Sequence, residues 1–545
     1  MTRLIKGRKI GGWGVLALVI GLIALPATGA PKGRDSLGDR AFLHMSQSVG
    51  LRYYIEHPDQ APGRLAERLA AASEVAGSGR AVASSSSSAG RGDVFNGDDL
   101  GLPQNEESVS VCRSNPKIVL SGTNDYRGLV DPEGNFTGWH FSNSGGKSLT
   151  NEGLLPPVEI AGAQVPSGGD PVDVVDNENC DLYAASLNYD PEDPFHNDNG
   201  VGLYRTDPAT LASCPGGTDP SCWPTRRAVA TARPDHFLDK EWFDQGKSGA
   251  RDVVWVTYSD FNVVDEAPLG FTRAEIFAVR CSADLATCTD PIPISVDDQD
   301  VQFSDVTIAE DGTTYVTWAQ IEGELEFEPQ VFTIKMRVAP PGSTTFGPER
   351  VVAVEELAIP FGGFLHANDF RVATYPKNEV KTRGDESRAF VVWDACSVRP
   401  LDTVCEEPVI KLTYSDDQGV NWSTPKVISA GGDNYFPAIA DGQKKLAVAW
   451  FTNRYDPLFH NRQDVELVEL DSSGEVTDRH RLTRPSNESE ADPILGGFFI
   501  GDYIELDIES GRAYVGYNAN YRHVELLGEG FPIPQQDNYL KRVRL

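Results

Sequence analysis

Val253-Val-Trp-Val-Thr-Tyr-Ser-Asp260 is the segment that decides the fold. It is rich in β-branched and aromatic residues, its side chains alternate, and it ends in polar residues, which is typical of a strand and not of a helix. Successive segments of this kind lie roughly 60–75 residues apart, enough chain for one four-stranded sheet with its loops. The repeat therefore predicts an all-β protein, a β-propeller. The seven such runs are Ile118–Tyr126, Leu182–Asp190, Val253–Phe261, Thr314–Ile321, Arg388–Cys396, Lys445–Tyr455 and Arg512–Tyr521.

A shorter alternating segment precedes each apolar run, and a third and a fourth strand follow it, as in Ile410–Tyr414 and Lys426–Ser429. Four antiparallel strands per unit make a propeller blade. Seven runs favour seven blades, with six as the alternative if one run belongs to an insertion. The last repeat ends early, and its missing outer strand can come from the start of the domain. The preceding segments are Glu106–Val111, Asp170–Val175, Asp239–Phe243, Asp305–Ile308, Asp369–Val372, Asn434–Ile439 and Asp502–Leu506.

The overall charge restricts the class of partner. The chain has 545 residues, a formal net charge of −32 and a pI near 4.6. An acidic surface repels phosphate, which argues against nucleic acid and against anionic membranes as partners. A soluble, secreted protein kept in solution by its charge accounts for this composition, and we expect it to be a monomer.

The N-terminal segment has the pattern of a signal peptide over residues 1–30. Four basic residues precede an apolar stretch from Gly11 to Leu25, and Thr28-Gly-Ala30 offers small residues for cleavage. A retained membrane anchor is the alternative, but the apolar stretch is short and interrupted by Gly. Residues 31–98 are predicted to be a leader with some helical composition and a Ser-rich linker, and residues 99–545 to form the propeller.

Eight cysteines in an exported chain suggest disulfides. Three pairs are close in sequence, and the two remaining cysteines would pair across neighbouring repeats. Zinc is the rival interpretation, but the chain has no Cys-x-x-Cys pair or Cys/His cluster with metal spacing. The predicted pairs are Cys112–Cys180, Cys214–Cys222, Cys281–Cys288 and Cys396–Cys405.

A turn motif in the fifth repeat identifies a family. The segment Ser415-Asp-Asp-Gln-Gly-Val-Asn-Trp422 matches Ser-x-Asp-x-Gly-x-x-Trp, the Asp-box, through Ser415, Asp417, Gly419 and Trp422. In such a turn the Asp caps backbone amides, the Gly takes a positive φ and the Trp packs between sheets. The chain thus resembles the sialidase-like, BNR-repeat propeller superfamily over residues 99–545. Gln104-Asn-Glu106, Asp239-Lys-Glu-Trp242 and Gly501-Asp-Tyr503 are similar to its secreted bacterial members.

The resemblance also implies a catalytic set to look for. Sialidases use a Tyr nucleophile assisted by Glu, an Asp acid/base and three Arg that clamp a carboxylate. Tyr503 with Glu505 is the candidate nucleophile pair, and Arg371 and Arg454 are candidate clamp residues. The first blade departs from the family pattern, because it has no Arg where a Phe/Tyr-Arg-x-Pro motif is expected. We therefore expect no sialidase catalysis.

A different group of polar residues points to binding. Repeat equivalence predicts that the first polar residues of the seven short segments ring one mouth of the central channel, where converging carboxylates need a cation, waters or raised pKa values. Ca²⁺ is the candidate cation, and local capping of each strand start is the alternative explanation. Two long loops that share Tyr-Asp-Pro and Phe-His-Asn add His196 and His460 to this face. The predicted ring is Glu106, Asp170, Asp239, Asp305, Asp369, Asn434 and Asp502.

Together these patterns predict a secreted propeller that binds a glycan or an extracellular protein on its Asp-rich face without sialidase catalysis. Two alternatives stay open: an exo-glycosidase of the sialidase type, which a clustered Arg triad would favour, and an extracellular interaction scaffold with no small ligand, which an acidic mouth without Arg would allow.

Overall fold

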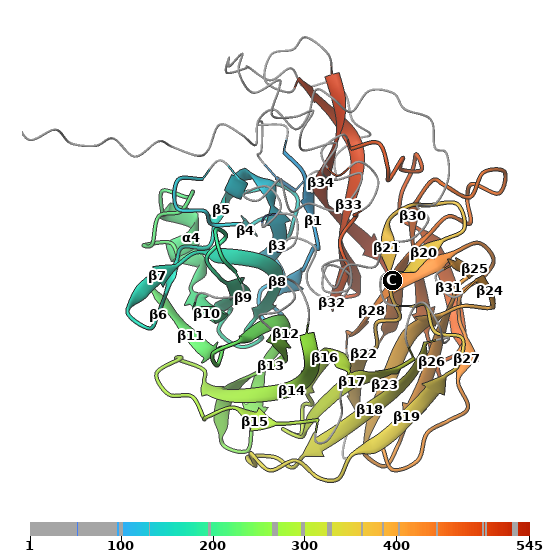
Figure 1. Cartoon of the computed structure of the whole chain (residues 1–545), viewed down its shortest axis with the longest axis horizontal. Coiled ribbons are helices and arrows are strands. Elements are labelled where there is room, and N and C mark those ends of the chain that lie inside the picture. The colour runs from blue at the N-terminus through green and yellow to red at the C-terminus, as the bar shows by residue number, and fades with distance from the viewer. Residues whose placement is uncertain are drawn as a thin grey trace, which may run out of the picture.

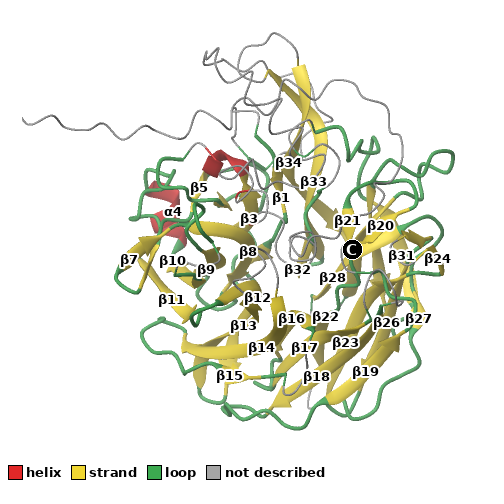
Figure 2. Cartoon of the chain, in the orientation of Figure 1, coloured by secondary structure: helices red, strands yellow, loops and turns green. Residues whose placement is uncertain are grey.

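The fold is known from a computed structural model. It describes residues 49, 52, 95–96, 102–129, 131–194, 198–263, 271–295, 300–323, 330–360, 363–383, 386–401, 404–442, 445–492, 495, 499–525 and 532–545. The predicted signal peptide and almost all of the predicted leader lie outside these residues. Within the described part, nearly all regular structure is β, and antiparallel sheets stand in a ring (Figures 1 and 2). The predicted all-β propeller is confirmed.

Each apolar run forms the second strand of its own sheet, because its alternating side chains pack against a neighbouring sheet on both faces. Four fully buried tryptophans, Trp255, Trp318, Trp393 and Trp450, occupy these second strands and fill the spaces between sheets. The second strands are β3 (Val119–Asp125), β9 (Leu182–Asn188), β13 (Arg251–Val263), β17 (Thr314–Glu322), β23 (Glu386–Ala395), β29 (Leu446–Thr452) and β33 (Arg512–Glu525).

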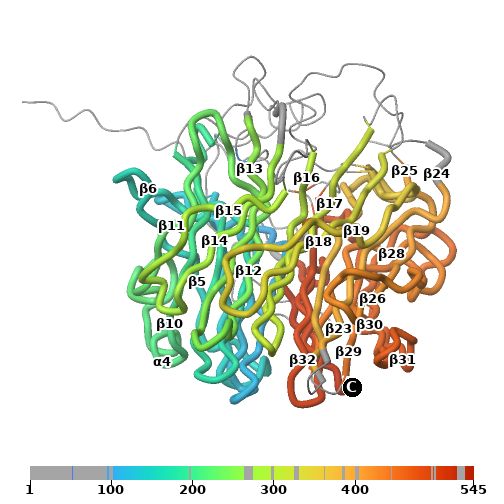
Figure 3. The backbone as a smooth tube through the Cα atoms, turned by 90° about the horizontal axis from the view of Figure 1, so that it is seen from below, coloured from blue at the N-terminus to red at the C-terminus, as the bar shows by residue number. Residues whose placement is uncertain are grey.

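The innermost strands line the centre of the ring. Each contacts the innermost strands of its two neighbouring sheets, and the last contacts the first, so the ring closes on itself (Figure 1). Turned by 90°, the molecule shows strands that run from one face of the ring to the other (Figure 3). A blade count of seven stays a prediction, although each run has its own sheet. The innermost strands are β2 (Ser110–Val111), β8 (Ser167–Val175), β12 (His236–Ser248), β16 (Val301–Ile308), β22 (Lys377–Arg383), β28 (Asn434–Asp441) and β32 (Glu505–Glu509).

The outer strands complete the sheets. In the described residues the last sheet has three strands, and the Phe95 amide donates a hydrogen bond to the Asn538 carbonyl on its outermost strand, 3.0 Å away. The third strands are β4 (Thr137–Ser142), β10 (Gly200–Thr206), β14 (Phe271–Ser282), β18 (Val331–Ala339), β26 (Val409–Ser415), β30 (Asp464–Leu470) and β34 (Pro532–Arg544). The fourth strands are β5 (Asn151–Leu154), β11 (Thr225–Thr231), β15 (Ile292–Pro293), β19 (Arg350–Glu355), β27 (Lys426–Val427) and β31 (Val476–Arg481). The first sheet also contains β1 (Gln104–Asn105), which pairs with β3 beside β2.

The first strand of the fifth sheet is not the predicted one. Asp369–Val372 supplies β21 (Arg371–Val372), which belongs to a small separate sheet with β20 (Gly363–Leu365), β24 (Val398–Leu401) and β25 (Val404–Glu406). The strand that pairs with β23 is β22. Two short alternating segments, Asp369–Val372 and β22, precede the run that forms β23. Their local sequence patterns are alike, and only the tertiary pairing with β23 shows which of them is the first strand.

All four predicted disulfides are present. Cys112–Cys180 joins the turns of the first and second sheets, and Cys214–Cys222 and Cys281–Cys288 clamp the connections between third and fourth strands. The remaining small elements are α4 (Pro208–Ser213), whose first turn is capped by Asp207, the 3₁₀ turn η5 (Tyr126–Leu129) and the hairpin of β6 (Val158–Ile160) with β7 (Ala163–Val165).

The turn after β26 has the hydrogen bonds that its sequence requires. Asp417 accepts the Asn421 amide at 2.8 Å, the Ser415 hydroxyl accepts the Gly419 amide at 2.8 Å, and Gly419 has a φ of +84°. Trp422 donates to the Gly419 carbonyl and packs beside the core between the fourth and fifth sheets. The assignment of this turn to the Asp-box family stays a prediction.

Candidate functional site

A bulge in the innermost strands shapes the centre of the ring. Non-glycine residues with φ between 54° and 59° interrupt or precede these strands, and register shifts accompany most of the bulges. Such a φ is rarely adopted by L-residues, so the surrounding structure must hold it. The predicted ring residues stand at different positions relative to this bulge: Glu106 and Asp170 are at it, Asp239 comes one residue before it, and Asp305 comes two residues after it. The residues concerned are Glu106, Asp170, Lys240, Phe303 and Phe436.

Bulge residues of three sheets meet in a buried ion cluster. The Lys240 ammonium lies 2.6 Å from an Asp502 carboxylate oxygen and 3.5 Å from Asp170. Arg371 reaches Asp502 through its Nε at 3.1 Å, and Glu106 accepts the Asp502 amide at 3.0 Å. All five side chains are almost completely buried. Burial opposes the charge on Asp502, but Arg371 and Lys240 outweigh it and lower the pKa of that carboxyl.

The seven predicted ring residues divide into separate environments. Glu106, Asp170 and Asp502 join the ion cluster, and buried Asp239 accepts the Lys240 amide. Asp305 accepts both the backbone and the side-chain amide of Asn378.

The other two predicted ring residues lie elsewhere. Asp369 is exposed beside the small separate sheet. Asn434 faces its own blade, where it accepts the Trp450 indole N–H at 2.9 Å. The prediction of seven equivalent groups at one level is therefore wrong, because the bulges and the inserted sheet break the equivalence.

Tyr503 and Glu505 do not form a nucleophile pair in this geometry. The Tyr503 hydroxyl donates to the Pro171 carbonyl at 2.8 Å, and its ring packs edge-on against Trp242. Burial, together with the nearby Glu106 and Asp170 carboxylates, raises the pKa of Tyr503 and so opposes the phenolate that a nucleophile needs.

The two candidate arginines bind different carboxylates. Arg371 is buried against Asp502, whereas Arg454 pairs with Glu466 at 2.8 Å beside Tyr455. His460 is exposed and has a φ of +56°. His196 lies outside the described residues. The described part of the chain thus does not bring the predicted carboxylate clamp together.

The central channel contains a cavity of about 370 Å³ at the opposite end from the ion cluster. Its walls are formed by the innermost strands, and its rim by turns that lead to the second strands, such as Asn177–Glu178 and Glu310. The Glu178 side chain on the rim is 65% exposed, whereas Lys377, at the start of β22, is 3% exposed. Eleven carboxylic and three basic residues line the cavity. Of the predicted site residues, Asp305 and Glu505 are among them.

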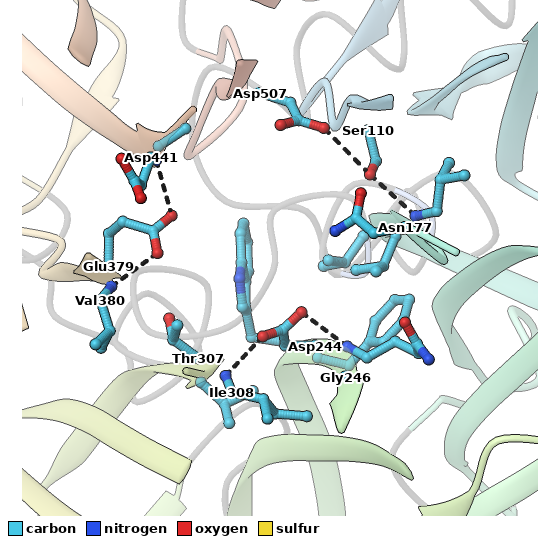
Figure 4. Close-up of a pocket in the computed structure, with 18 of the residues that line it drawn as sticks. Ser110, Asn177, Asp244, Gly246, Thr307, Ile308, Glu379, Val380, Asp441 and Asp507 are labelled. Atoms are coloured by element: carbon cyan, nitrogen blue, oxygen red, sulfur yellow. Dashed lines mark hydrogen bonds between the residues drawn. The ribbon is translucent and has the colours of Figure 1, made fainter. Parts of the chain in front are cut away.

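Side chains on the cavity wall join three pairs of neighbouring sheets (Figure 4). Asp507 accepts the Val111 amide at 2.7 Å, Asp244 accepts the Ile308 amide at 2.6 Å, and Glu379 accepts the Asp441 amide at 3.2 Å. Burial raises the pKa of Asp244 to about 7 and that of Asp507 to about 6. These carboxyl groups were not singled out from the sequence, although each occupies an alternate position of a first strand, which is the signal that could have found them.

Lys377 is the unusual group of the cavity. It comes from β22, lies over the Trp242 ring, and its ammonium has no hydrogen-bond partner among the described residues. Burial lowers the pKa of Lys377 to about 8, although the nearby Asp305 and Glu505 oppose this effect. Burial likewise raises the pKa of Glu505 to about 8. An amine that can be neutral and a carboxyl that can be protonated therefore share one cavity at neutral pH.

A group of side chains that could serve as metal ligands lies elsewhere in the described residues. Glu469, Asp478 and His480, on β30 and β31, are the one group of three described side chains whose ligand atoms are close enough for a single ion. Lys445 already pairs with Glu469 there. The predicted ring residues do not form such a group in the described part of the chain, and Ca²⁺ binding stays a prediction. No helix of the described residues is long and apolar enough to cross a membrane.

Comparison with known proteins gives distant structural likenesses. No protein-family profile matches the chain, and no curated protein matches it. A Hadza microbial sialidase aligns with a TM-score of 0.40 and 10% identity over 75% of this chain and 73% of its own. An α-L-arabinanase of Penicillium chrysogenum aligns at 0.40 and 10% over 84% and 98%, and the polysaccharide lyase Uly1 at 0.43 and 10% over 83% and 92%. Likenesses at this level say nothing about the activity of this chain.

Proposed function

We propose that this protein is a secreted, non-catalytic propeller that binds a glycan in its central cavity. The cavity carries the proposal: about 370 Å³ lies within the usual range for ligand pockets. Its carboxyl groups can accept hydrogen bonds from sugar hydroxyls. Four disulfides suit an oxidising, extracellular compartment. The proposed site lies at the other end of the channel from the Asp-rich mouth that the sequence suggested.

The absence of sialidase catalysis is part of the proposal, and two contacts support it. The Tyr503 hydroxyl is engaged with a backbone carbonyl, and Arg371 is engaged with Asp502. Neither group is free to attack an anomeric carbon or to clamp a substrate carboxylate. We expect no hydrolysis of a fluorogenic sialoside. Hydrolysis that is lost in Tyr503→Phe would establish the sialidase alternative instead.

Binding can be tested by blocking the cavity rim. Neutral and acidic oligosaccharides are titrated by calorimetry against the wild-type protein and against Glu178→Trp, which places an indole at the rim. The matched control is Asp416→Trp, on the outer turn after β26 and equally exposed. We expect binding to be lost in the rim variant alone, with an unchanged melting temperature. Binding that persists in Glu178→Trp would show that the ligand binds outside the cavity. Binding of none of the glycans would favour the interaction scaffold, and a Ca²⁺ titration of the melting temperature tests the predicted cation.

A further inference from the structure

We propose that Lys377 forms an imine with the carbonyl group of an aldehyde ligand, such as the open-chain reducing end of a sugar that enters the central cavity. The inference deepens the proposed glycan site and rests on the same cavity. The geometry that carries it is a buried amine with no hydrogen-bond partner among the described residues, on the wall of a cavity that a carboxyl group also lines. The residues concerned are Lys377 and Glu505.

The surroundings of Lys377 explain why its amine is available. Trp242 lies against the ammonium, and the rings of Tyr375 and Tyr503 lie 5.0 and 5.6 Å from it, so aromatic faces replace the acceptors that a buried lysine normally has. A buried donor without an acceptor is costly, and a ligand oxygen would relieve that cost. Desolvation also favours the neutral amine, which is the nucleophilic form.

The carboxyl group of Glu505 supplies the protons. It lines the same cavity and is close enough to influence the charge of Lys377. Burial, together with the nearby Asp305 and Asp507 carboxyl groups, raises the pKa of Glu505 to about 8, so its carboxyl group keeps its proton at neutral pH. It can therefore act as a proton donor at neutral pH, as a general acid must.

The reaction balances without an oxidant or a metal. The Lys377 nitrogen attacks the carbonyl carbon, a C–N bond forms, and the C=O π pair moves to oxygen, which takes a proton from Glu505. The nitrogen then returns a proton to the Glu505 carboxylate. Finally, the nitrogen lone pair expels the hydroxyl group, which leaves as water with the Glu505 proton. The products are a protonated imine on Lys377, a Glu505 carboxylate and one water.

Reductive trapping tests the inference on the full chain. The protein is incubated with glycolaldehyde and sodium cyanoborohydride at pH 7.5, and modified lysines are located by peptide mapping. Lys117 and Lys147 are exposed internal references that do not line the cavity. An ordinary lysine has a pKa of about 10.4, so a lysine near 8 presents far more neutral amine. We expect Lys377 to be labelled at least about tenfold faster than the references, at a rate that rises through about pH 8.

Two variants separate chemistry from structure. Glu505→Gln should slow labelling of Lys377 at least about fivefold while the reference lysines keep their rates, since it removes the proton donor. Glu475→Gln, an exposed change on the outer edge of the sixth sheet, should change neither rate. Labelling spread evenly over all lysines, or absent from Lys377, would overturn the inference. Glycan binding without labelling of Lys377 would support the proposed function and overturn the imine inference. Labelling of Lys377 without glycan binding would support the imine inference and contradict the proposed function.

Discussion

The Lys240 ammonium and the Asp502 carboxylate form an ion pair of 2.6 Å that connects the third sheet to the segment entering the seventh, 262 residues along the chain. Asp170 and Glu106 interact with the same lysine, and Arg371 also pairs with Asp502, so two cations lie among carboxylates from three parts of the ring. Breaking a buried pair leaves uncompensated charge, which typically costs about 3–5 kcal/mol.

Lys240→Met should therefore lower the free energy of unfolding by about 3 kcal/mol or more, as measured by chemical denaturation. Lys247→Met is the matched control, because the Lys247–Glu178 pair is exposed, and exposed pairs contribute little to stability. Equal effects of the two variants would show that the cluster is not a structural centre.

Stability should fall as the pH rises from about 4 to about 8, in part because of Glu505. Burial raises the pKa of Glu505 to about 8, whereas an unfolded Glu ionises near 4.3. Between these values the folded state holds a proton that the unfolded state has lost, so folding becomes less favourable with rising pH. In Glu505→Gln, the free energy of unfolding should fall less by pH 7 than in the wild-type protein, by on the order of 3 kcal/mol. The free energy of unfolding is measured by chemical denaturation from pH 5 to 8, with Glu475→Gln as the control. An identical pH slope in Glu505→Gln would contradict the prediction.

The fold was predictable because its signal is local and repeated. Alternating runs such as Val253–Phe261 encode second strands directly, and cysteine spacing encoded all four disulfides. The candidate site was harder to predict, because it depends on how far along the channel axis each side chain lies. One bulge in a strand shifts every later residue relative to its neighbours. Asp305 lines the cavity and not the mouth where the sequence pattern placed it, and Asp369 lies beside an inserted sheet.

Lys377 could not have been found by sequence pattern alone. It is one lysine at the start of a strand, and besides the neighbouring Tyr375 its surroundings are the rings of Trp242 and Tyr503, which come from distant parts of the chain. The ion cluster is similar, since Lys240 and Asp502 are neighbours only after the ring has closed.

The turn after β26 should be more sensitive to a methyl group than a comparable turn elsewhere. Gly419 and Gly342 both have positive φ, at +84° and +77°, so alanine strains either one by about 1 kcal/mol. A Cβ at Gly419 would also meet Met336 at 3.2 Å and Trp422 at 3.4 Å, whereas a Cβ at Gly342 would meet nothing within 4 Å. Gly419→Ala should therefore destabilise the protein more than Gly342→Ala, by up to about 1 kcal/mol in thermal unfolding. Equal losses of stability in the two variants would show that the core beside Trp422 accommodates the added methyl group at little cost.

The long-range disulfide should contribute more to stability than the short ones. Cys112–Cys180 closes a loop with a sequence separation of 68, whereas Cys281–Cys288 has a separation of 7. Closing a loop restricts the unfolded chain, and the entropy lost grows with the logarithm of loop length, which gives a difference of about 2 kcal/mol. The double variants Cys112→Ala/Cys180→Ala and Cys281→Ala/Cys288→Ala are matched in chemistry, since each removes one bridge. Chemical denaturation under oxidising conditions should show the larger loss for the first. A larger loss for the second would mean that native-state packing, and not the unfolded chain, determines what these bridges contribute.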